Sequence, residues 1–227
     1  MKRLGFSLCP VGQRQESVAV LVRQQLTYSW GEMETKHYWL AVVNAILLVG
    51  FGSRFALKLN FEFIIYVAVI ILFFVLVYLS YDRVRYRFLT LVGLTLWSAL
   101  HLAGGGLNVG DGRLYDTMLL TLSTDLPIFR YDQLVHMIGF GVATLAMFDL
   151  VSPVLKDPKS PSIGVAIVIL MAGLGVGALN ETVEFLVNLA VPESGVGGYV
   201  NTSLDLCSNL LGGIIALAYI RLMYQSD

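Results

Sequence analysis

The sequence predicts an all-α fold: a polytopic membrane protein built as a bundle of six transmembrane helices. Only 14% of the 227 residues are charged and 56% are hydrophobic, whereas about a quarter of an ordinary soluble domain is charged. The mean hydropathy is +0.73, and apolar runs of about 18 residues or more, long enough to cross the hydrocarbon core, recur along the chain. Composition and run length together argue against a water-soluble single domain.

The net charge and the cysteine count argue against nucleic acid as a partner and against a fold held by disulfides. A net charge of −1 provides no basic surface for nucleic acid. The two cysteines, Cys9 and Cys207, supply no disulfide framework. Membrane lipids are therefore the expected surroundings.

Residues 1–37 are expected to form a cytoplasmic N-terminal tail, ahead of a six-span membrane domain over residues 38–227. The tail is polar, and its longest apolar stretch, residues 17–22, is far too short to cross a bilayer. Too few apolar residues precede Gln13 and Arg14 for a signal peptide.

The first three spans are predicted at Tyr38–Leu57, Phe61–Tyr81 and Phe88–Leu107. The first opens with Tyr38 and Trp39 and the second closes with Tyr81, which suits the headgroup level where amphipathic rings settle. The third runs into a glycine-rich segment, residues 104–112, which is expected to be a flexible loop.

The last three spans are predicted at Leu134–Val151, Ile163–Val191 and Leu204–Met223. Tyr131 precedes the fourth span and Tyr224 follows the sixth, so aromatic rings again mark the ends.

The distribution of Lys and Arg predicts the orientation, because short positively charged loops stay on the cytoplasmic side. Eleven of the 15 basic residues fall in the tail, the second and fourth loops and the C-terminus, and four fall in the first and third loops. The protein is expected in the plasma or inner membrane of the cell. Both termini are therefore expected in the cytoplasm, and the third and fifth loops outside.

Eight polar side chains lie within or at the edge of the last four spans, where each is costly unless it faces a protein interior. They come from four segments, WSALHLAGGG, YDQLVHMIGF, NETVEF and LDLCSNLLGG. The residues are His101, Asp132, His136, Asn180, Glu181, Glu184, Asp205 and Asn209.

Spacing and depth place these side chains together. Three pairs lie three or four positions apart, so the members of each pair share one helix face. At about 1.5 Å per residue, His101 lies about 20 Å from the start of its span and Glu181 about 27 Å from the start of its own. Since these spans run outward and the fourth and sixth begin outside, all eight residues are expected in one outer layer. The cytoplasmic half of the spans is nearly free of ionisable groups.

The charge balance of this layer points to a divalent metal ion of unknown identity. Carboxylates and imidazoles converge with no Lys or Arg in the four segments that carry them, and the nearest basic residues are Arg113 and Arg130. Such a cluster is relieved by sharing protons or by holding a cation, and its ligand types are those of metal sites in helical bundles. The expected ligands are Asp132, His136, Glu181, Glu184 and Asp205; His136, Glu181 and Glu184 are candidate catalytic groups; His101, Asn180 and Asn209 complete the polar site.

Structural roles compete with this hypothesis. Polar groups at span ends stabilise helix packing by about 1 kcal/mol each; His101 can bond a carbonyl, and Asp132 and Asp205 can cap the helices that they begin. Glu181 and Glu184 fit this role poorly, because two acids one turn apart are weak packing groups.

Two smaller features concern packing. Gly173 and Gly177 give the fifth span a face of small residues for close approach of another helix. Cys207 lies off the common face of Asp205 and Asn209 and is expected to be a buried free thiol rather than a ligand.

The order of four motifs resembles a known family. The motifs are W-x3-H-x2-GG, YD-x3-H, NE-x2-EF and NT-x2-D-x3-N-x2-G. Over roughly residues 38–224 this set resembles the YjdF-type family of uncharacterised multi-pass inner-membrane proteins. That family is similar to VanZ-like proteins, some of which are linked to glycopeptide antibiotic resistance. The resemblance implies a multi-pass membrane fold and supplies no reaction. It marks six residues that depth and charge also select: Asp132, His136, Glu181, Glu184, Asp205 and Asn209.

Two classes of function fit these expectations. The first is a membrane-embedded enzyme acting on a lipid or lipid-linked substrate at the outer leaflet, through a metal or through acid/base groups. The second is non-catalytic: a protein that binds or conducts a cation or proton, or a lipid-binding factor whose polar layer is structural. The scarcity of ionisable groups in the cytoplasmic half favours the enzyme over a transporter.

Overall fold

The computed structural model describes residues 35–155, 161–191, 194–195 and 197–225. They fall in one compact unit of the chain, Thr35–Asp227. All but the last three residues of the predicted tail, 1–37, lie outside the described residues, as does Cys9.

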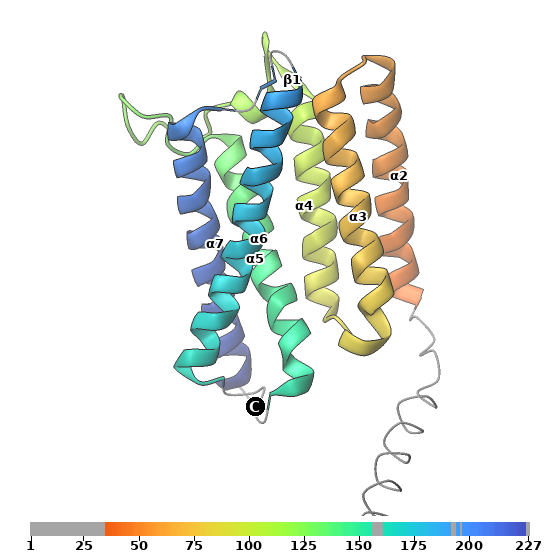
Figure 1. Ribbon diagram of the computed structural model, residues 1–227, viewed down its shortest axis with the longest axis vertical. Coiled ribbons are helices and arrows are strands. Elements are labelled where there is room, and N and C mark those ends of the chain that lie inside the picture. Colours follow the sequence, from red (N-terminus) through yellow and green to blue (C-terminus); the bar gives the residue numbers. More distant parts are fainter. Residues whose placement is uncertain (1–34, 156–160, 192–193, 196, 226–227) are drawn as a thin grey trace, which may run out of the picture. The chain divides into compact units, whose positions relative to one another are not determined.

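The predicted six-helix bundle is confirmed, because six helices within these described residues are long and apolar enough to cross a membrane. The helices alternate in direction, so that α3, α5 and α7 begin at the end where α2, α4 and α6 finish (Figure 1). We call this end the site end. The helices are α2 Thr35–Leu57, α3 Phe61–Val84, α4 Phe88–Gly106, α5 Tyr131–Val151, α6 Ile163–Ala190 and α7 Tyr199–Gln225.

Short elements join the helices. At the site end, α4 is followed by a hairpin of two strands with two residues each, β1 Asn108–Val109 and β2 Gly112–Arg113. The 3₁₀ turn η1 Leu114–Asp116 comes next. The second 3₁₀ turn, η2 Ser152–Val154, follows α5 at the opposite end. The predicted glycine-rich loop is therefore partly a hairpin, in which Gly110 takes the left-handed φ of 59° that favours glycine.

Three helices begin earlier than predicted, α2 and α5 by three residues and α7 by five. A prediction from apolar run length leaves a polar first turn out of the span, but the backbone hydrogen bonds of the helix continue through that turn. As a consequence Asp132 lies in the first turn of α5 and Asp205 in the second turn of α7. Neither is an N-cap, so the capping role considered for them is wrong.

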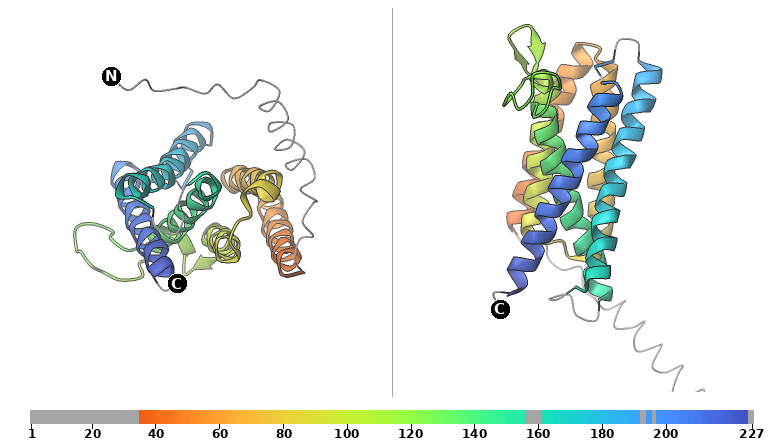
Figure 2. Two further views of the ribbon diagram at one scale, coloured as in Figure 1. Left: turned by 90° about the horizontal axis from the view of Figure 1, so that it is seen from below. Right: turned by 90° about the vertical axis from the view of Figure 1, so that its left-hand side faces the viewer.

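Helix α5 is the centre of the bundle. Half of its central stretch is buried, against 11–28% in the other five helices, and it packs most extensively on α7, then on α6 and α4 (Figure 2). A Cβ on Gly212 of α7 would overlap the backbone oxygen of Met137. A Cβ on Gly173 would lie 3.1 Å from the Cα of Thr144, so the predicted small-residue face of α6 does approach a neighbouring helix.

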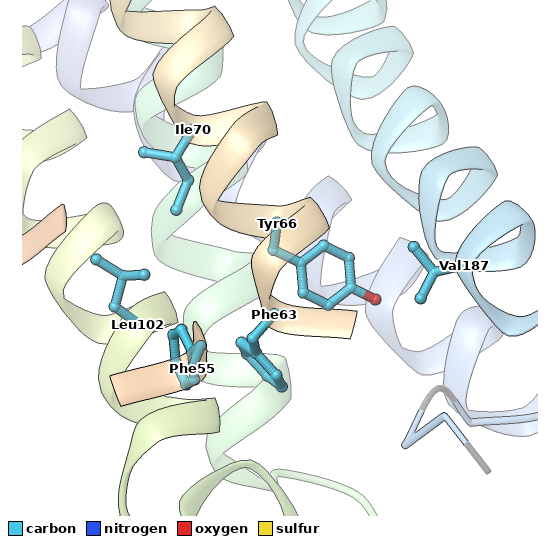
Figure 3. Close-up of a cluster of buried hydrophobic side chains, with 6 residues drawn as sticks. All are labelled: Phe55, Phe63, Tyr66, Ile70, Leu102 and Val187. Carbon is cyan, nitrogen blue, oxygen red and sulfur yellow. The ribbon is translucent and has the colours of Figure 1, made fainter. Parts of the chain in front are cut away.

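A cluster of buried apolar side chains joins four helices (Figure 3). Tyr66 points from α3 toward Val187 of α6, with Phe63 beside it. Phe55 of α2 and Leu102 of α4 lie on the other side of α3. This cluster fixes α3 against α6 next to the polar residues described below.

The half of the bundle away from the site end does contain one buried acid. Asp149, near the end of α5, is 3% exposed. Its Oδ2 accepts hydrogen bonds from Arg87 N at 3.1 Å and Thr90 Oγ1 at 2.7 Å, and its Oδ1 lies 3.5 Å from Arg87 Nε. Asp149 thereby ties the end of α5 to the start of α4, and its bonds are those of a structural anchor.

Candidate functional site

His136 lies at the centre of the polar layer, on the second turn of α5, and is 5% exposed. Its Nε2 lies 3.6 Å from Asp132 Oδ1 and 3.7 Å from Glu184 Oε1. Its Nδ1 lies 3.1 Å from Asn209 Oδ1 and 3.5 Å from Glu181 Oε1. Side chains of α5, α6 and α7 therefore meet at the two nitrogens of one imidazole.

The acids of α6 project together toward α5, because Glu181 and Glu184 lie three positions apart on the helix. Asn180, four positions before Glu184, donates from Nδ2 to Glu184 Oε1 at 2.7 Å. The side chain of Glu181 is 9% exposed. The α6 segment therefore provides one acid held by a neighbouring amide and one that is buried without such a neighbour.

Helix α7 supplies Asp205 and Asn209, both fully buried. One turn earlier, Asn201 donates from Nδ2 to Asp205 Oδ2 at 2.6 Å and to Asp132 Oδ2 at 3.2 Å, so a single amide links carboxylates of two helices. Sequence analysis did not select Asn201 as a site residue, because the predicted span begins at Leu204, although the motif NT-x2-D begins with Asn201. Its position four residues before Asp205 on the same helix is the signal that could have found it.

Several buried polar atoms of the cluster have no hydrogen bond within the described part of the chain. They are Glu181 Oε1 and Oε2, Asp205 Oδ1 and Asn209 Nδ2. Buried polar groups are nearly always bonded, and leaving one unbonded costs about 1–3 kcal/mol. These atoms are therefore available to bind an ion, a water molecule or a group of a substrate.

Two overlapping sets of three side chains offer ligand atoms within 4.8 Å of one another. One set is Asp132, His136 and Asp205, and the other is His136, Glu181 and Glu184. The five residues predicted as metal ligands therefore lie together, on three helices.

A pocket of about 70 Å³ lies beside this cluster at the site end, with room for several water molecules or a small polar group. Asp132 and Glu184 line it, so the cluster is reached from the pocket. Arg113 and Arg130 line it as well, and Arg130 Nε is buried without a hydrogen bond to any described residue. The pocket thus presents both carboxylates and cationic groups.

His101 lies in an aromatic wall of the pocket, apart from the carboxylates. Its Nδ1 is 2.6 Å from Tyr115 Oη, and the rings of Tyr66 and Trp97 lie 5.4 and 5.5 Å from its own. The carbonyl bond considered for His101 is therefore replaced by a bond to a phenol. Gly104 permits this arrangement, because a Cβ there would lie 2.6 Å from the Tyr115 ring.

Burial raises the pKa of the Tyr115 phenol well above its usual range, and the Asp132 carboxylate raises it further. The phenol therefore stays protonated at neutral pH. It can donate its hydrogen to His101 Nδ1.

Glu62, which sequence analysis did not select, also lines the pocket. It lies in the first turn of α3 and is 8% exposed. Arg113 Nη1 lies 3.3 Å from both of its carboxylate oxygens, and Gly195 N donates to Oε2 at 2.9 Å. These partners are 51 and 133 residues away in the chain, so no local spacing marks Glu62 as part of the site.

A family model described as "Predicted membrane protein (DUF2238)" matches residues 35–226. The chain belongs to this family. The resemblance inferred from the four motifs is thereby confirmed, and the match includes every residue of the polar cluster and of the pocket. Neither the curated proteins nor the solved structures include a significant match to the chain.

Most of the site predicted for this DUF2238 protein lies together in the structure. Seven of the eight polar residues gather on α5, α6 and α7, and His101 joins them through the pocket. Cys207 is exposed, not buried as expected, because its side of α7 faces the surface of the bundle. The arrangement can bind a cation, exchange protons between neighbouring carboxyl groups, or hold a small group between acids and arginines.

Proposed function

We propose that this DUF2238 protein is a membrane-embedded, metal-dependent enzyme that acts on a lipid or lipid-linked substrate. The observation that carries the proposal is the contact of a buried histidine with carboxylates from separate helices, next to buried carboxyl oxygens that bond to no described residue. The cluster adjoins a pocket at the end of the spans. Intramembrane ionisable groups of this kind mark functional sites.

The donor set suits a divalent metal. Two ligands that each lie about 2.1 Å from a tetrahedral zinc ion are roughly 3.4 Å apart. The carboxylate oxygens of Asp132 and Glu184 lie 3.6 and 3.7 Å from His136 Nε2, so small movements suffice to bring the three side chains onto one ion. One imidazole with several carboxylates is compatible with zinc, manganese or iron.

The surroundings of His136 assign separate tasks to its two nitrogens. With an Nδ1 hydrogen donated to Asn209 Oδ1, 3.1 Å away, Nε2 would be free to bind a metal next to Asp132 and Glu184. Glu181 is the candidate for moving a proton, because neither carboxyl oxygen bonds to another described residue. A bound metal would polarise a substrate oxygen or activate water.

The pocket favours an anionic group on the substrate. Arg113 and Arg130 line it together with the acids, and a metal with nearby guanidinium groups is a typical environment for phosphoryl or carboxyl oxygens. With a volume of about 70 Å³ the pocket accepts part of a headgroup, while the lipid chain stays in the bilayer. The position of the pocket at the end of the spans is consistent with a lipid or lipid-linked substrate.

We further propose that the protein lies in the cell membrane with both termini in the cytoplasm and the pocket facing outside. The support is the excess of Lys and Arg on the side of the termini, 11 of 15.

Metal analysis of the purified full-length protein tests the proposal. We expect near-stoichiometric zinc, manganese or iron in the wild type and at least about a tenfold loss of affinity in Glu184→Gln, since ligand-shell changes typically cost that much. Asp125→Asn removes an exposed carboxylate from a loop and is the matched control, expected to keep its metal. A wild-type protein that stays folded and binds none of these metals in a metal-replete buffer would refute the proposal.

The non-catalytic alternative depends on the same carboxyl oxygens, which have no hydrogen bond to a described residue and could carry a cation or proton. It predicts ion flux in proteoliposomes that disappears in Glu181→Gln. Asp149, the buried acid of the opposite half, is already engaged by Arg87 and Thr90, which disfavours a relay through that half.

A further inference from the structure

We propose that the loop at residues 117–129 inserts its leucine side chains into the lipid leaflet at the site end of the bundle. This inference is independent of the proposed metal and enzyme activity. The loop, TMLLTLSTDLPIF, contains one charged residue, Asp125. Four of its leucines are among the exposed large side chains: Leu119 (37%), Leu120 (57%), Leu122 (65%) and Leu126 (44%).

The loop has a defined conformation, so its leucines are displayed by a fixed backbone. At the base, Leu119 N donates to Phe129 O at 3.1 Å and Tyr131 N donates to Thr117 O at 2.9 Å. At the tip, Ser123 Oγ accepts hydrogen bonds from the backbone N–H groups of the two residues at 125 and 126, each at 3.2 Å. Closed base and capped tip together make a compact surface loop.

The direction of the loop suits a membrane surface. The loop, drawn in green, projects sideways from the bundle beside the beginning of α7, whereas the β1–β2 hairpin projects along the bundle axis (Figures 1 and 2). A segment that extends sideways at the level where the spans end lies at the boundary between headgroups and acyl chains. The hairpin, by contrast, leads away from the membrane.

Lipid is the occupant that the chemistry favours. Exposed apolar side chains that gather on a surface mark interaction sites on proteins, and the loop lies beside the beginning of α7, where Tyr199 and Val200 are also exposed, at 87% and 46%. The hydroxyl groups of Thr121, Ser123 and Thr124 and the single carboxylate of Asp125 suit the headgroup level. Shallow apolar insertion with polar groups at the surface is the arrangement of interfacial membrane segments.

Insertion of the loop would also fix the depth of the pocket. The loop begins directly after Tyr115 and Asp116 and ends directly before Arg130, and all three line the pocket. Leucines held in the leaflet would therefore keep both walls of the pocket at headgroup level, whichever molecule the pocket binds.

A depth measurement in proteoliposomes tests the proposal. In a full-length Cys9→Ser, Cys207→Ser background, an environment-sensitive fluorophore is attached to Leu122→Cys, and to Val109→Cys as the matched control. Val109 is also exposed and apolar, at 51%, but lies on the hairpin. We expect several-fold stronger quenching of the label at 122 by lipids spin-labelled near the headgroup, several-fold weaker quenching by iodide, and a blue-shifted emission.

A second variant excludes insertion driven by the label itself. With the fluorophore on Thr121→Cys, the additional changes Leu120→Ser and Leu122→Ser should restore iodide quenching to the level of the label at 109. Equal iodide quenching at 122 and 109 in the parent background would overturn the proposal. So would shielding of the label at 122 from both quenchers, which would indicate a protein partner or a second copy on the loop. Neither measurement needs bound metal, so failure of one proposal leaves the other testable.

Discussion

Asn209 is the residue through which α7 orients the central imidazole. It is fully buried, and its Oδ1 lies 3.1 Å from His136 Nδ1. Groups that hold the second nitrogen of a metal-binding histidine set its tautomer and ring orientation. The site therefore depends on a side chain that would not itself bind a metal.

Replacing Asn209 tests this dependence. We expect Asn209→Ala to weaken metal binding by roughly 10- to 100-fold, because the imidazole loses its orienting partner while its ligand nitrogen remains. The measurement is a competition titration with a metal-sensitive dye. Ser208→Ala, which removes only a hydroxyl bonded to Leu204 O of its own helix, should bind as the wild type does. Equal affinity in the Asn209 variant would contradict the proposed role.

Tyr115 makes the stability of the protein sensitive to alkaline pH. The folded protein holds this phenol at a raised pKa, whereas the unfolded chain has a pKa of about 10. Its contribution to stability is therefore complete below about pH 10 and decreases as the pH rises further. In thermal unfolding of detergent-solubilised protein, Tyr115→Phe should lose less stability than the wild type between about pH 9 and 11. Parallel losses in the two proteins would show that the phenol does not contribute.

Most of the residues that sequence analysis found lie inside predicted spans, and those that it missed lie at or beyond the ends of the spans. His136, Glu181 and Glu184 could be predicted because an ionisable group inside a span is costly wherever its partners lie. Glu62 and Asn201 were not selected, because the former lies at the edge of a span and the latter outside the predicted one. Their importance comes from partners on other segments, which only the folded chain brings near.

At the level of helices, the contact between α5 and α7 depends on glycines, which have no side chain. A Cβ on Gly212 would overlap the backbone oxygen of Met137 and lie 3.0 Å from Gly141 N. Backbone atoms cannot move aside as a flexible side chain can. The two helices that present His136 and Asp205 are therefore held at the distance that glycine allows.

Gly212→Ala should separate these helices and destabilise the protein by about 1–3 kcal/mol, the usual cost of overpacking. Gly175→Ala is the matched control on α6, because nothing lies within 4 Å of its added Cβ. The control should be neutral or stabilising by up to about 1 kcal/mol, because alanine is the better helix former. Thermal unfolding of both variants gives the comparison. A Gly212 variant as stable as the control would show that the contact is looser than described.

The helices themselves were largely predictable, and their polar ends were not. Apolar run length locates all six spans, because a membrane helix needs about 20 apolar residues. It places the starts of α5 and α7 three and five residues late, since polar first turns such as those at Asp132 and Asn201 are buried among their own partners rather than in lipid.

Across the whole molecule the two ends differ in chemistry. The site end brings together several acids and a histidine with unbonded polar atoms, whereas Asp149 at the opposite end is neutralised by Arg87 and bonded to Thr90. The sequence predicted this asymmetry, although it did not predict the exception at Asp149. This asymmetry is what the proposed function at one face of the membrane requires.

The proposed orientation is tested by fusions. A reporter active only in the cytoplasm should be active when fused after Gln225, and inactive when inserted at Gly110 in the hairpin of the site end. The reason is the distribution of Lys and Arg, since translocating the basic loops is unfavourable. The reverse pattern of activity would assign the pocket to the cytoplasmic leaflet and leave its geometry unaffected.

The close approach of α5 and α7 has a consequence for motion. His136, Asp132, Asp205 and Asn209 all belong to this pair of helices, whose backbones touch at Gly212 and leave little freedom to slide. Glu181 and Glu184 belong to α6 instead. Any helix movement that draws the cluster around a guest ion would therefore come from α6 rather than from sliding of α5 against α7.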